Sequence, residues 1–305
     1  MPNPQIYGLI GYPVKHSLSP LMHNAAFAEL NINAEYRLFE IAPDNLENFL
    51  LKDIVVKDTQ GNPARSKDIS GFNITIPHKV NAKEILEKKF PYVQGELIQQ
   101  DAYYVKLSGA VNTVKREGNR LLYWNTDSSG FLRSLEEDLV FKAQGKSILV
   151  IGCGGAGRAV IAALSWRNIK VDKIYVYDAN ESAAGAAKEH FLKFPQVDGK
   201  LEFILDKDIP QIIKECHLLV NASPVGMKES DGAIIDKNLL HGGLSVYDVV
   251  YNRLTQLIKD ARVKGIPAKD GRGMLLFQGA NAFELWTGAR APVEVMRQAL
   301  ERGLK

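Results

Sequence analysis

The chain has 305 residues, 46% of them hydrophobic, and a formal net charge of +3; it is long enough for two ordinary domains, and its charge does not favour a nucleic-acid partner. Two cysteines, Cys153 and Cys216, are too few for a metal-binding set or a disulfide framework. No apolar run is long enough to cross a bilayer, and the N-terminus lacks a signal-peptide pattern. We therefore expect a cytoplasmic protein with no metal, membrane or nucleic-acid partner.

The first 125 residues predict a small α/β domain. Ser19 followed by Pro20 predicts a helix N-cap with proline at the first helical position. Residues 52–68 are polar, with Gly61-Asn62-Pro63 marking a loop, and residues 109–124 predict a β-hairpin whose turn lies at 117–120. The remaining elements alternate along the chain: strands are expected over 5–10, 35–41 and 70–76, and helices over 20–30, 43–51 and 79–89.

The segment 126–274 predicts a doubly wound, Rossmann-type domain. It opens with a helix over 128–139, and helical segments separate most of its apolar runs. Two further helices, 273–286 and 292–302, are expected to pack back on the first domain. We thus expect a substrate-binding and catalytic domain of residues 1–125 completed by 275–305, and a dinucleotide-binding domain of residues 126–274. The expected strands of the second domain lie near 147–151, 173–177, 201–205, 217–220 and 244–248.

A glycine pattern lies where the strand at 147–151 meets the next helix. Gly152, Gly154 and Gly157 fit the spacing G-x-G-x-x-G, which carries information in this strand–turn–helix context. The first glycine permits a tight turn, the second lets a pyrophosphate approach the backbone, and the third lets helix and strand pack closely. The helix N-terminus adds N–H donors and the positive end of a dipole.

An acidic residue, Asp178, follows the next strand, 21 residues after Gly157. An acid about 20 residues past the glycines binds the ribose 2′-hydroxyl of a dinucleotide. The alternative is that Asp178 only caps the helix that begins near Asn180. A 2′-phosphate would repel this carboxylate, by on the order of 4 kcal/mol at ~4 Å and an effective dielectric near 20. The sequence therefore favours NAD over NADP.

Several polar residues of the first domain fall at the ends of predicted elements. Each has a plain structural explanation, such as a helix cap, a β-forming threonine or a solvated surface lysine. Their number beside an expected nicotinamide site instead favours binding of a polyhydroxylated substrate. These candidates are Ser17, Ser19, Asn73, Thr75, Lys79, Asn112 and Asp127.

Longer motifs resemble those of the shikimate dehydrogenase family, which includes the quinate/shikimate dehydrogenases. They occur in order from near residue 6 to near residue 290. They are Ser17-Leu18-Ser19-Pro20, the run from Gly71 to Lys79, Gly109-Ala110-Val111-Asn112-Thr113, the run from Asn125 to Gly130, the glycine turn, the run from Asn221 to Met227, and the run from Gly273 to Gln278.

The resemblance implies an enzyme that interconverts shikimate and 3-dehydroshikimate by hydride transfer. It implies Lys79 and Asp127 as the catalytic pair, with Lys79 as the proton-transfer group. The implied substrate-binding residues are Ser17, Ser19, Thr75, Lys79, Asn112, Asp127, Tyr251 and Gln278. The implied cofactor-binding residues are Gly152, Gly154, Gly155, Ala156, Gly157, Asp178, Asn221, Gly226 and Met274.

The chain departs from the family pattern in three places. NADP-using members carry Asn-Arg-Thr after the second strand of the cofactor domain, whereas this chain has Asp178-Ala179-Asn180 and lacks the arginine for a 2′-phosphate. This difference resembles the NAD-using quinate/shikimate branch. The segments 57–68 and 88–106 are longer than in compact members, and surface elaboration is the expected explanation.

Three alternative functions stay open. Quinate can be the main or a second substrate, since the choice depends on space beside Ser17, Ser19 and Tyr251. A methylenetetrahydrofolate dehydrogenase-like enzyme also pairs a lysine with a dinucleotide domain, but the two-serine turn suits a pterin poorly. A catalytically silent dinucleotide-binding sensor would not need Lys79, Asp127 and Gln278 together. The expected assembly is a monomer or a homodimer.

Overall fold

The computed structural model describes residues 3–93, 100–166 and 168–304, and it divides into two compact units. Unit 1 comprises Met1–Thr126 and Leu276–Lys305, and unit 2 comprises Asp127–Leu275. Each boundary lies one residue from the expected one. Both ends of the chain therefore contribute to unit 1.

Unit 1 contains a mixed five-stranded sheet in the order β2-β1-β5-β6-β7. β1 runs parallel to both β2 and β5, whereas β6 is antiparallel to β5 and β7. Glu117 pairs with Arg120, and Gly118 between them has a φ of 57°, which confirms the predicted hairpin. The strands are β1 (Gln5–Gly11), β2 (Ala34–Glu40), β5 (Ile69–Ile74), β6 (Thr113–Glu117) and β7 (Arg120–Trp124).

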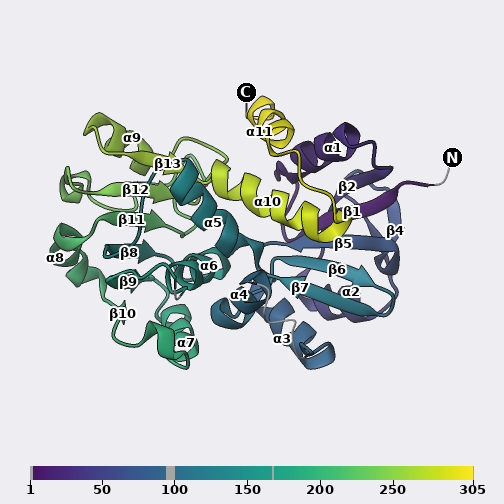
Figure 1. Ribbon diagram of the computed structural model, residues 1–305, viewed down its shortest axis with the longest axis horizontal. Helices are drawn as coiled ribbons and strands as arrows, with labels where there is room; N and C mark the ends of the chain where they lie inside the picture. Colours follow the sequence, from purple (N-terminus) through teal and green to yellow (C-terminus); the bar gives the residue numbers. More distant parts are fainter. Residues whose placement is uncertain (1–2, 94–99, 167, 305) are drawn as a thin grey trace. The chain divides into compact units, whose positions relative to one another are not determined.

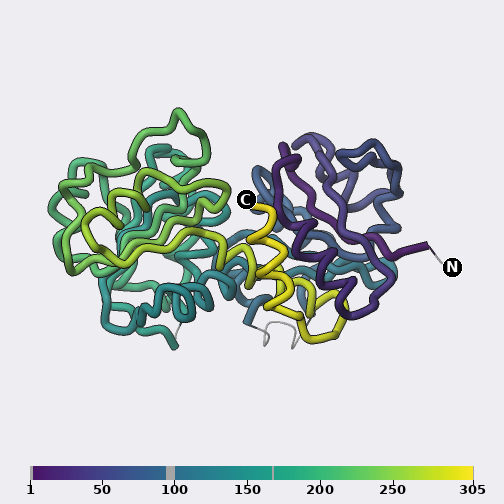
Figure 2. Tube along the Cα trace, turned by 90° about the horizontal axis from the view of Figure 1, so that it is seen from above, coloured from purple at the N-terminus to yellow at the C-terminus, as the bar shows by residue number. Residues whose placement is uncertain are grey.

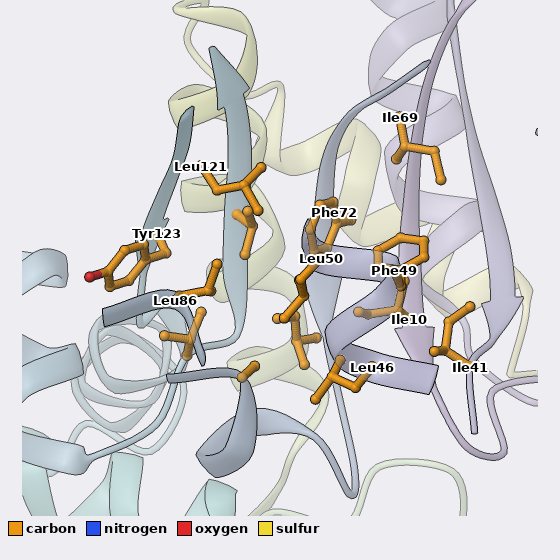
Figure 3. Packing of buried hydrophobic residues seen from close by; sticks show 14 of the residues in the cluster. Ile10, Ile41, Leu46, Phe49, Leu50, Ile69, Phe72, Leu86, Leu121 and Tyr123 are labelled. Carbon is orange, nitrogen blue, oxygen red and sulfur yellow. The ribbon is translucent and has the colours of Figure 1, made fainter. Parts of the chain in front are cut away.

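Apolar side chains hold the helices of unit 1 against this sheet. Phe49 of α2 meets Phe72 of β5 edge to face, with ring centroids 5.2 Å apart, within the core of Figure 3. At the C-terminus α11 packs against α1, as the yellow and purple ends of the trace show in Figure 2. The helices are α1 (Ser19–Glu29), α2 (Leu46–Leu51), α3 (Lys79–Lys89), α4 (Gln100–Ser108), α10 (Arg272–Thr287, which begins in unit 2) and α11 (Val293–Arg302).

The polar segment 52–68 contains a short antiparallel hairpin that was not predicted, β3 (Val55–Lys57) and β4 (Pro63–Arg65), and Gly61 and Asn62 of the predicted loop lie in its turn. Asp58 organises its turn by accepting hydrogen bonds from the backbone N–H groups of Gln60 and Asn62. Ser19 is not an N-cap: α1 begins at Ser19 itself, and the cap position, Leu18, makes no side-chain cap bond. Part of the longer segment 88–106 forms α4, and residues 94–99 lie outside the described residues.

Unit 2 contains a parallel six-stranded sheet in the order β10-β9-β8-β11-β12-β13 (Figure 1). Numbered within the unit, this is the Rossmann order 3-2-1-4-5-6, which confirms the doubly wound prediction. The sixth strand, β13, was not predicted from the sequence. The strands are β8 (Ser147–Ile151), β9 (Lys173–Tyr177), β10 (Leu201–Phe203), β11 (Leu218–Asn221), β12 (Ser245–Asp248) and β13 (Ala268–Asp270).

The central strands of unit 2 are buried on both faces, as a parallel sheet covered by helices requires. Between β8 and β11 the chain direction of the crossovers reverses, which is the switch point where ligands bind in open α/β sheets. The helices are α5 (Thr126–Glu137), α6 (Gly155–Leu164), α7 (Glu181–Phe191), α8 (Ile209–Ile212) and α9 (Gln256–Val263).

Candidate functional site

The carboxyl ends of β1 and β5 bring two predicted segments together in unit 1. The strands are parallel neighbours, so both end at the same edge of the sheet. Tyr12 N–H donates to the Ile76 carbonyl at 3.0 Å, and a Cβ on Gly11 would lie 2.4 Å from Thr75 Cγ2. The loop that leads to the two serines therefore runs against the loop that leads to Lys79.

The two serines form a close pair of hydroxyls. Ser17 Oγ donates to Ser19 Oγ at 3.2 Å and accepts from the Ser19 N–H at 3.3 Å. Ser19 is 4% exposed and Ser17 is half-buried. Two hydroxyls beside the start of α1 are suited to donate hydrogen bonds to a carboxylate, which accepts on both oxygens.

The turn between β5 and α3 fixes the backbone of Lys79. Lys79 is the first residue of α3, and its carbonyl accepts from Val111 N–H at 2.9 Å. The buried His78 contacts the Ile41 carbonyl through Nε2 at 2.7 Å, and burial lowers the pKa of this imidazole below its ordinary value. His78 was not predicted as a site residue, because its partner lies 37 residues away in the sequence.

Asn112 and Gln278 meet across 166 residues of sequence. Asn112 Nδ2 donates to Gln278 Oε1 at 3.3 Å, and the two side chains are 2% and 7% exposed. A Cβ on Gly279 would lie 2.4 Å from Met22 Cε, so α10 passes close to α1 beside Gln278. Unit 1 thus gathers Ser17, Ser19, Thr75, Lys79, Asn112 and Gln278 from four separate stretches of the chain.

Three further predicted residues belong to unit 2. Asp127, in the first turn of α5, and Met274, in α10, are each 5% exposed, and Tyr251 is half-buried after β12. The catalytic pairing of Lys79 with Asp127 joins residues of different units and stays a prediction.

The glycine turn between β8 and α6 has the geometry expected for a phosphate-binding loop. Gly152 has a φ of 99°, and a Cβ there would lie 2.7 Å from the backbone nitrogen of Ser223. A Cβ on Gly157 would lie 2.0 Å from the Gly152 carbonyl oxygen, whereas one on the exposed Gly154 would have no neighbour within 4 Å. The helix begins at Gly155, so the first turn formed by Gly155, Ala156 and Gly157 contributes N–H groups that lack partners within the helix. These residues fit a dinucleotide pyrophosphate.

Asp178 is anchored to this turn. Its Oδ2 accepts from Cys153 N–H at 2.8 Å, and its Oδ1 accepts from Asn180 N–H at 2.8 Å. The explanation that Asp178 only caps the following helix is wrong, because Asn180 is the N-cap of α7 and accepts from Ala183 N–H. The half-buried carboxylate sits at the end of β9 beside the glycine turn, as a ribose-binding acid does.

A buried acid that the sequence analysis missed, Asp248, supports the neighbouring loops of unit 2. Its Oδ1 accepts from Asn221 Nδ2 at 2.9 Å and its Oδ2 from Thr255 Oγ1 at 2.6 Å. Asp248 is fully buried, and desolvation raises the pKa of its carboxyl to about 6. Gly226, with a φ of 105°, packs against Thr255, where a Cβ would lie 2.8 Å from Thr255 Cγ2. Asp248 therefore links the predicted cofactor residues Asn221 and Gly226.

The described residues offer neither a metal-binding cluster nor a membrane-spanning helix. Within 3–93, 100–166 and 168–304, no cluster of three or more histidine, cysteine, aspartate or glutamate side chains could hold a metal ion. Over the same ranges, the helices are too short or too polar for a membrane span.

The Rossmann strand order, the glycine turn at the switch point and the acid after the second strand define unit 2 as a dinucleotide-binding fold. Residues 9–114 match the family model "Shikimate dehydrogenase substrate binding domain", and residues 271–301 match "Shikimate 5'-dehydrogenase C-terminal domain". The shikimate dehydrogenase (NADP(+)) of Methanopyrus kandleri is 37% identical over 303 residues, 98% of this chain and 96% of the relative. The chain therefore belongs to the shikimate dehydrogenase family.

Two crystal structures extend the similarity to the whole fold. Shikimate dehydrogenase from Aquifex aeolicus aligns with a TM-score of 0.80 and 34% identity over 98% of this chain and 99% of the other. Shikimate 5-dehydrogenase from Listeria monocytogenes, in complex with shikimate and NAD, aligns with a TM-score of 0.78 and 30% identity over 98% and 96%.

Proposed function

We propose that this chain is an NAD-dependent shikimate dehydrogenase that interconverts shikimate and 3-dehydroshikimate, with quinate as a second substrate. The observation that carries the proposal is the set of polar side chains gathered at one edge of the unit 1 sheet. Ser17 and Ser19 offer paired hydroxyls for the substrate carboxylate, and Asn112 and Gln278 offer amide groups for ring hydroxyls. Thr75 lies beside them at the end of β5. Such a set suits a small acid with several hydroxyls.

The proposed chemistry needs one group to move a proton. When bound, the nicotinamide supplies the hydride acceptor for the secondary alcohol. The hydroxyl proton leaves as the C–H hydride departs, and Lys79, as a free amine, is the proposed group that takes it and becomes the ammonium. Asp127 is proposed to orient the Lys79 side chain and the substrate hydroxyl, with Tyr251 near the substrate carboxylate and Met274 near the nicotinamide.

The choice of NAD over NADP depends on Asp178. Its carboxylate is already oriented by two backbone N–H groups, so a 2′-phosphate in the ribose position would meet a fixed negative charge. The two following residues, Ala179 and Asn180, supply no cation. The Methanopyrus relative is named for NADP(+), whereas the Listeria enzyme was crystallised with shikimate and NAD. We propose that this chain resembles the latter in its choice of cofactor.

Initial rates with two acids and two cofactors test the whole proposal. We expect the highest kcat/KM for shikimate with NAD and a lower value for quinate with NAD. A higher kcat/KM with NADP would contradict the cofactor assignment alone, and a higher value with quinate would reverse the order of substrates. NADH binding without reduction of 3-dehydroshikimate would instead favour the silent sensor.

A further inference from the structure

Tyr36, a residue of β2 that the proposed function does not use, is held by several contacts within unit 1. Its ring stacks on His23 of α1, with centroids 4.4 Å apart and planes at 7°. Asn24 binds its backbone on both sides, donating to the Tyr36 carbonyl at 3.2 Å and accepting from its N–H at 2.7 Å. The hydroxyl of this buried side chain donates to Asn73 Oδ1 at 2.8 Å.

The orientation of the Asn73 amide follows from a backbone partner. Asn73 Nδ2 lies 3.2 Å from the Asn112 carbonyl oxygen and 3.0 Å from Thr113 Oγ1. A carbonyl oxygen can only accept, so the amide nitrogen must face it and Oδ1 must face Tyr36. The Tyr36 hydroxyl is therefore the donor to Asn73.

The same reasoning fixes the Asn112 amide. Asn112 Oδ1 lies 2.7 Å from the backbone nitrogen of Thr126, which can only donate, so Asn112 Nδ2 is left to face Gln278 Oε1. Thr113 Oγ1 accepts from Asn73 Nδ2. Its own hydroxyl hydrogen can be donated to Asn112 Oδ1 or to Thr126 Oγ1, which lie 3.2 and 2.8 Å away. One continuous set of hydrogen bonds thus runs from the Tyr36 hydroxyl to the Asn112–Gln278 pair.

We propose that Tyr36 is a positioning residue for substrate recognition, whose hydroxyl, through Asn73 and Thr113, supports the orientation of the Asn112 amide that the Thr126 N–H sets at the substrate site. This inference rests on the proposed function, because only that function makes Asn112 and Gln278 partners of the substrate. Asn112 Nδ2 donates to Thr126 Oγ1 at 3.1 Å and to Gln278 Oε1 at 3.3 Å, so a substrate hydroxyl oxygen, which accepts, would take over or share the longer of these two bonds. Loss of the Tyr36 hydroxyl would leave Asn73 Oδ1 buried without this donor. The side chains of Asn73, Thr113 and Asn112 would then be less firmly oriented.

The test compares Tyr36→Phe with Tyr7→Phe. Tyr7 is buried in the same sheet, but its hydroxyl donates to Gln5 Oε1 and not to this network. We expect Tyr36→Phe to raise the KM for shikimate about fivefold, the effect of one lost hydrogen bond, with kcat and the KM for NAD within about twofold. Tyr7→Phe should match the wild type. An unchanged KM for shikimate in Tyr36→Phe, or an equal rise in the KM for NAD, would overturn the inference.

A double-mutant cycle with Thr113→Val tests whether Tyr36 acts through the network. If it does, Tyr36→Phe combined with Thr113→Val raises the KM no more than the larger single change; multiplied effects would mean that the two side chains act independently. The outcomes separate the two proposals. A wild type and a Tyr7→Phe variant that both fail to oxidise shikimate would refute the proposed function, whereas an active wild type matched by Tyr36→Phe would refute only the role of Tyr36.

Discussion

The two units form their candidate binding residues with different chemistry. In unit 1 the predicted substrate residues are held by side-chain hydrogen bonds, such as those that join Asn112 to Thr126 and Gln278. In unit 2 the glycine turn is shaped by main-chain contacts so close that a Cβ on Gly157 would lie 2.0 Å from a carbonyl oxygen. Polar side chains can select a particular hydroxylated acid. The shape of the backbone suits the pyrophosphate, which all such dinucleotides share.

Lys79→Ala should have the largest effect, because it removes the proposed proton-transfer group from the polar side chains of unit 1. We expect kcat to fall by ~10²–10⁴, with the KM for shikimate changed only a few-fold. Steady-state kinetics with shikimate and NAD give both values. Lys83→Ala, one turn further along α3 at a lysine that pairs with Glu87 at 2.6 Å, is the matched control and should leave both unchanged. A rise in KM without a fall in kcat would make Lys79 a binding residue.

Gly157→Ala tests the main-chain contacts of the glycine turn in unit 2. The added Cβ would collide with the Gly152 carbonyl, so we expect a loss of unfolding free energy of about 3 kcal/mol or more, measured by urea denaturation. Gly154→Ala meets no atom within 4 Å and is the matched comparison. It should fold normally but weaken NADH binding, because its methyl group lies where the pyrophosphate would approach the backbone. Equal stability of the two variants would contradict the division of roles among the glycines.

Asp248→Asn isolates the contribution of the buried Asp248 carboxyl to the stability of unit 2 from that of the main-chain contacts around it. Burial raises the pKa of Asp248 from 3.8 to about 6, so its contribution to stability is present below pH 4 and is lost as the pH rises through 6. The free energy of unfolding of the wild type minus that of the variant should therefore fall by up to ~3 kcal/mol between pH 4 and pH 7. The neighbouring Asp270, whose charge also raises this pKa, is unchanged in both proteins. Urea denaturation at the two pH values measures the difference, and a constant difference would contradict the prediction.

The same contrast explains which features the sequence could predict. The glycine turn and the acid after it are local patterns, and the apolar runs of β8 and β11 are typical of buried parallel strands, so the Rossmann order could be expected. The strand β13 has only the residues Ala-Lys-Asp, which have low strand propensity, and it forms because β12 offers it a partner.

The side-chain network of unit 1 could not be predicted in the same way. Tyr36 and Asn73 are 37 residues apart, and Asn112 and Gln278 are 166 apart. Each of these residues alone is an ordinary polar side chain on or next to a regular element, and only the folded sheet shows that their hydrogen bonds form one set. The family motifs identified Asn112 and Gln278, but nothing in the sequence indicated Tyr36, His78 or Asp248 as supports for the site.

Of the four substitutions considered in this comparison, Asp178→Asn should have the smallest effect; it tests a side chain that lies beside the main-chain contacts of the glycine turn. Asparagine keeps one acceptor oxygen for the Cys153 or Asn180 N–H but loses the charge that would oppose a 2′-phosphate. We expect the ratio of NADP to NAD in kcat/KM to rise on the order of tenfold, less than the full repulsion because solvent and side-chain movement relieve part of it. The ratio cancels a general loss of stability, which affects both cofactors alike. If the ratio does not change, the carboxylate does not select the cofactor, and its bonds to the glycine turn are its main role.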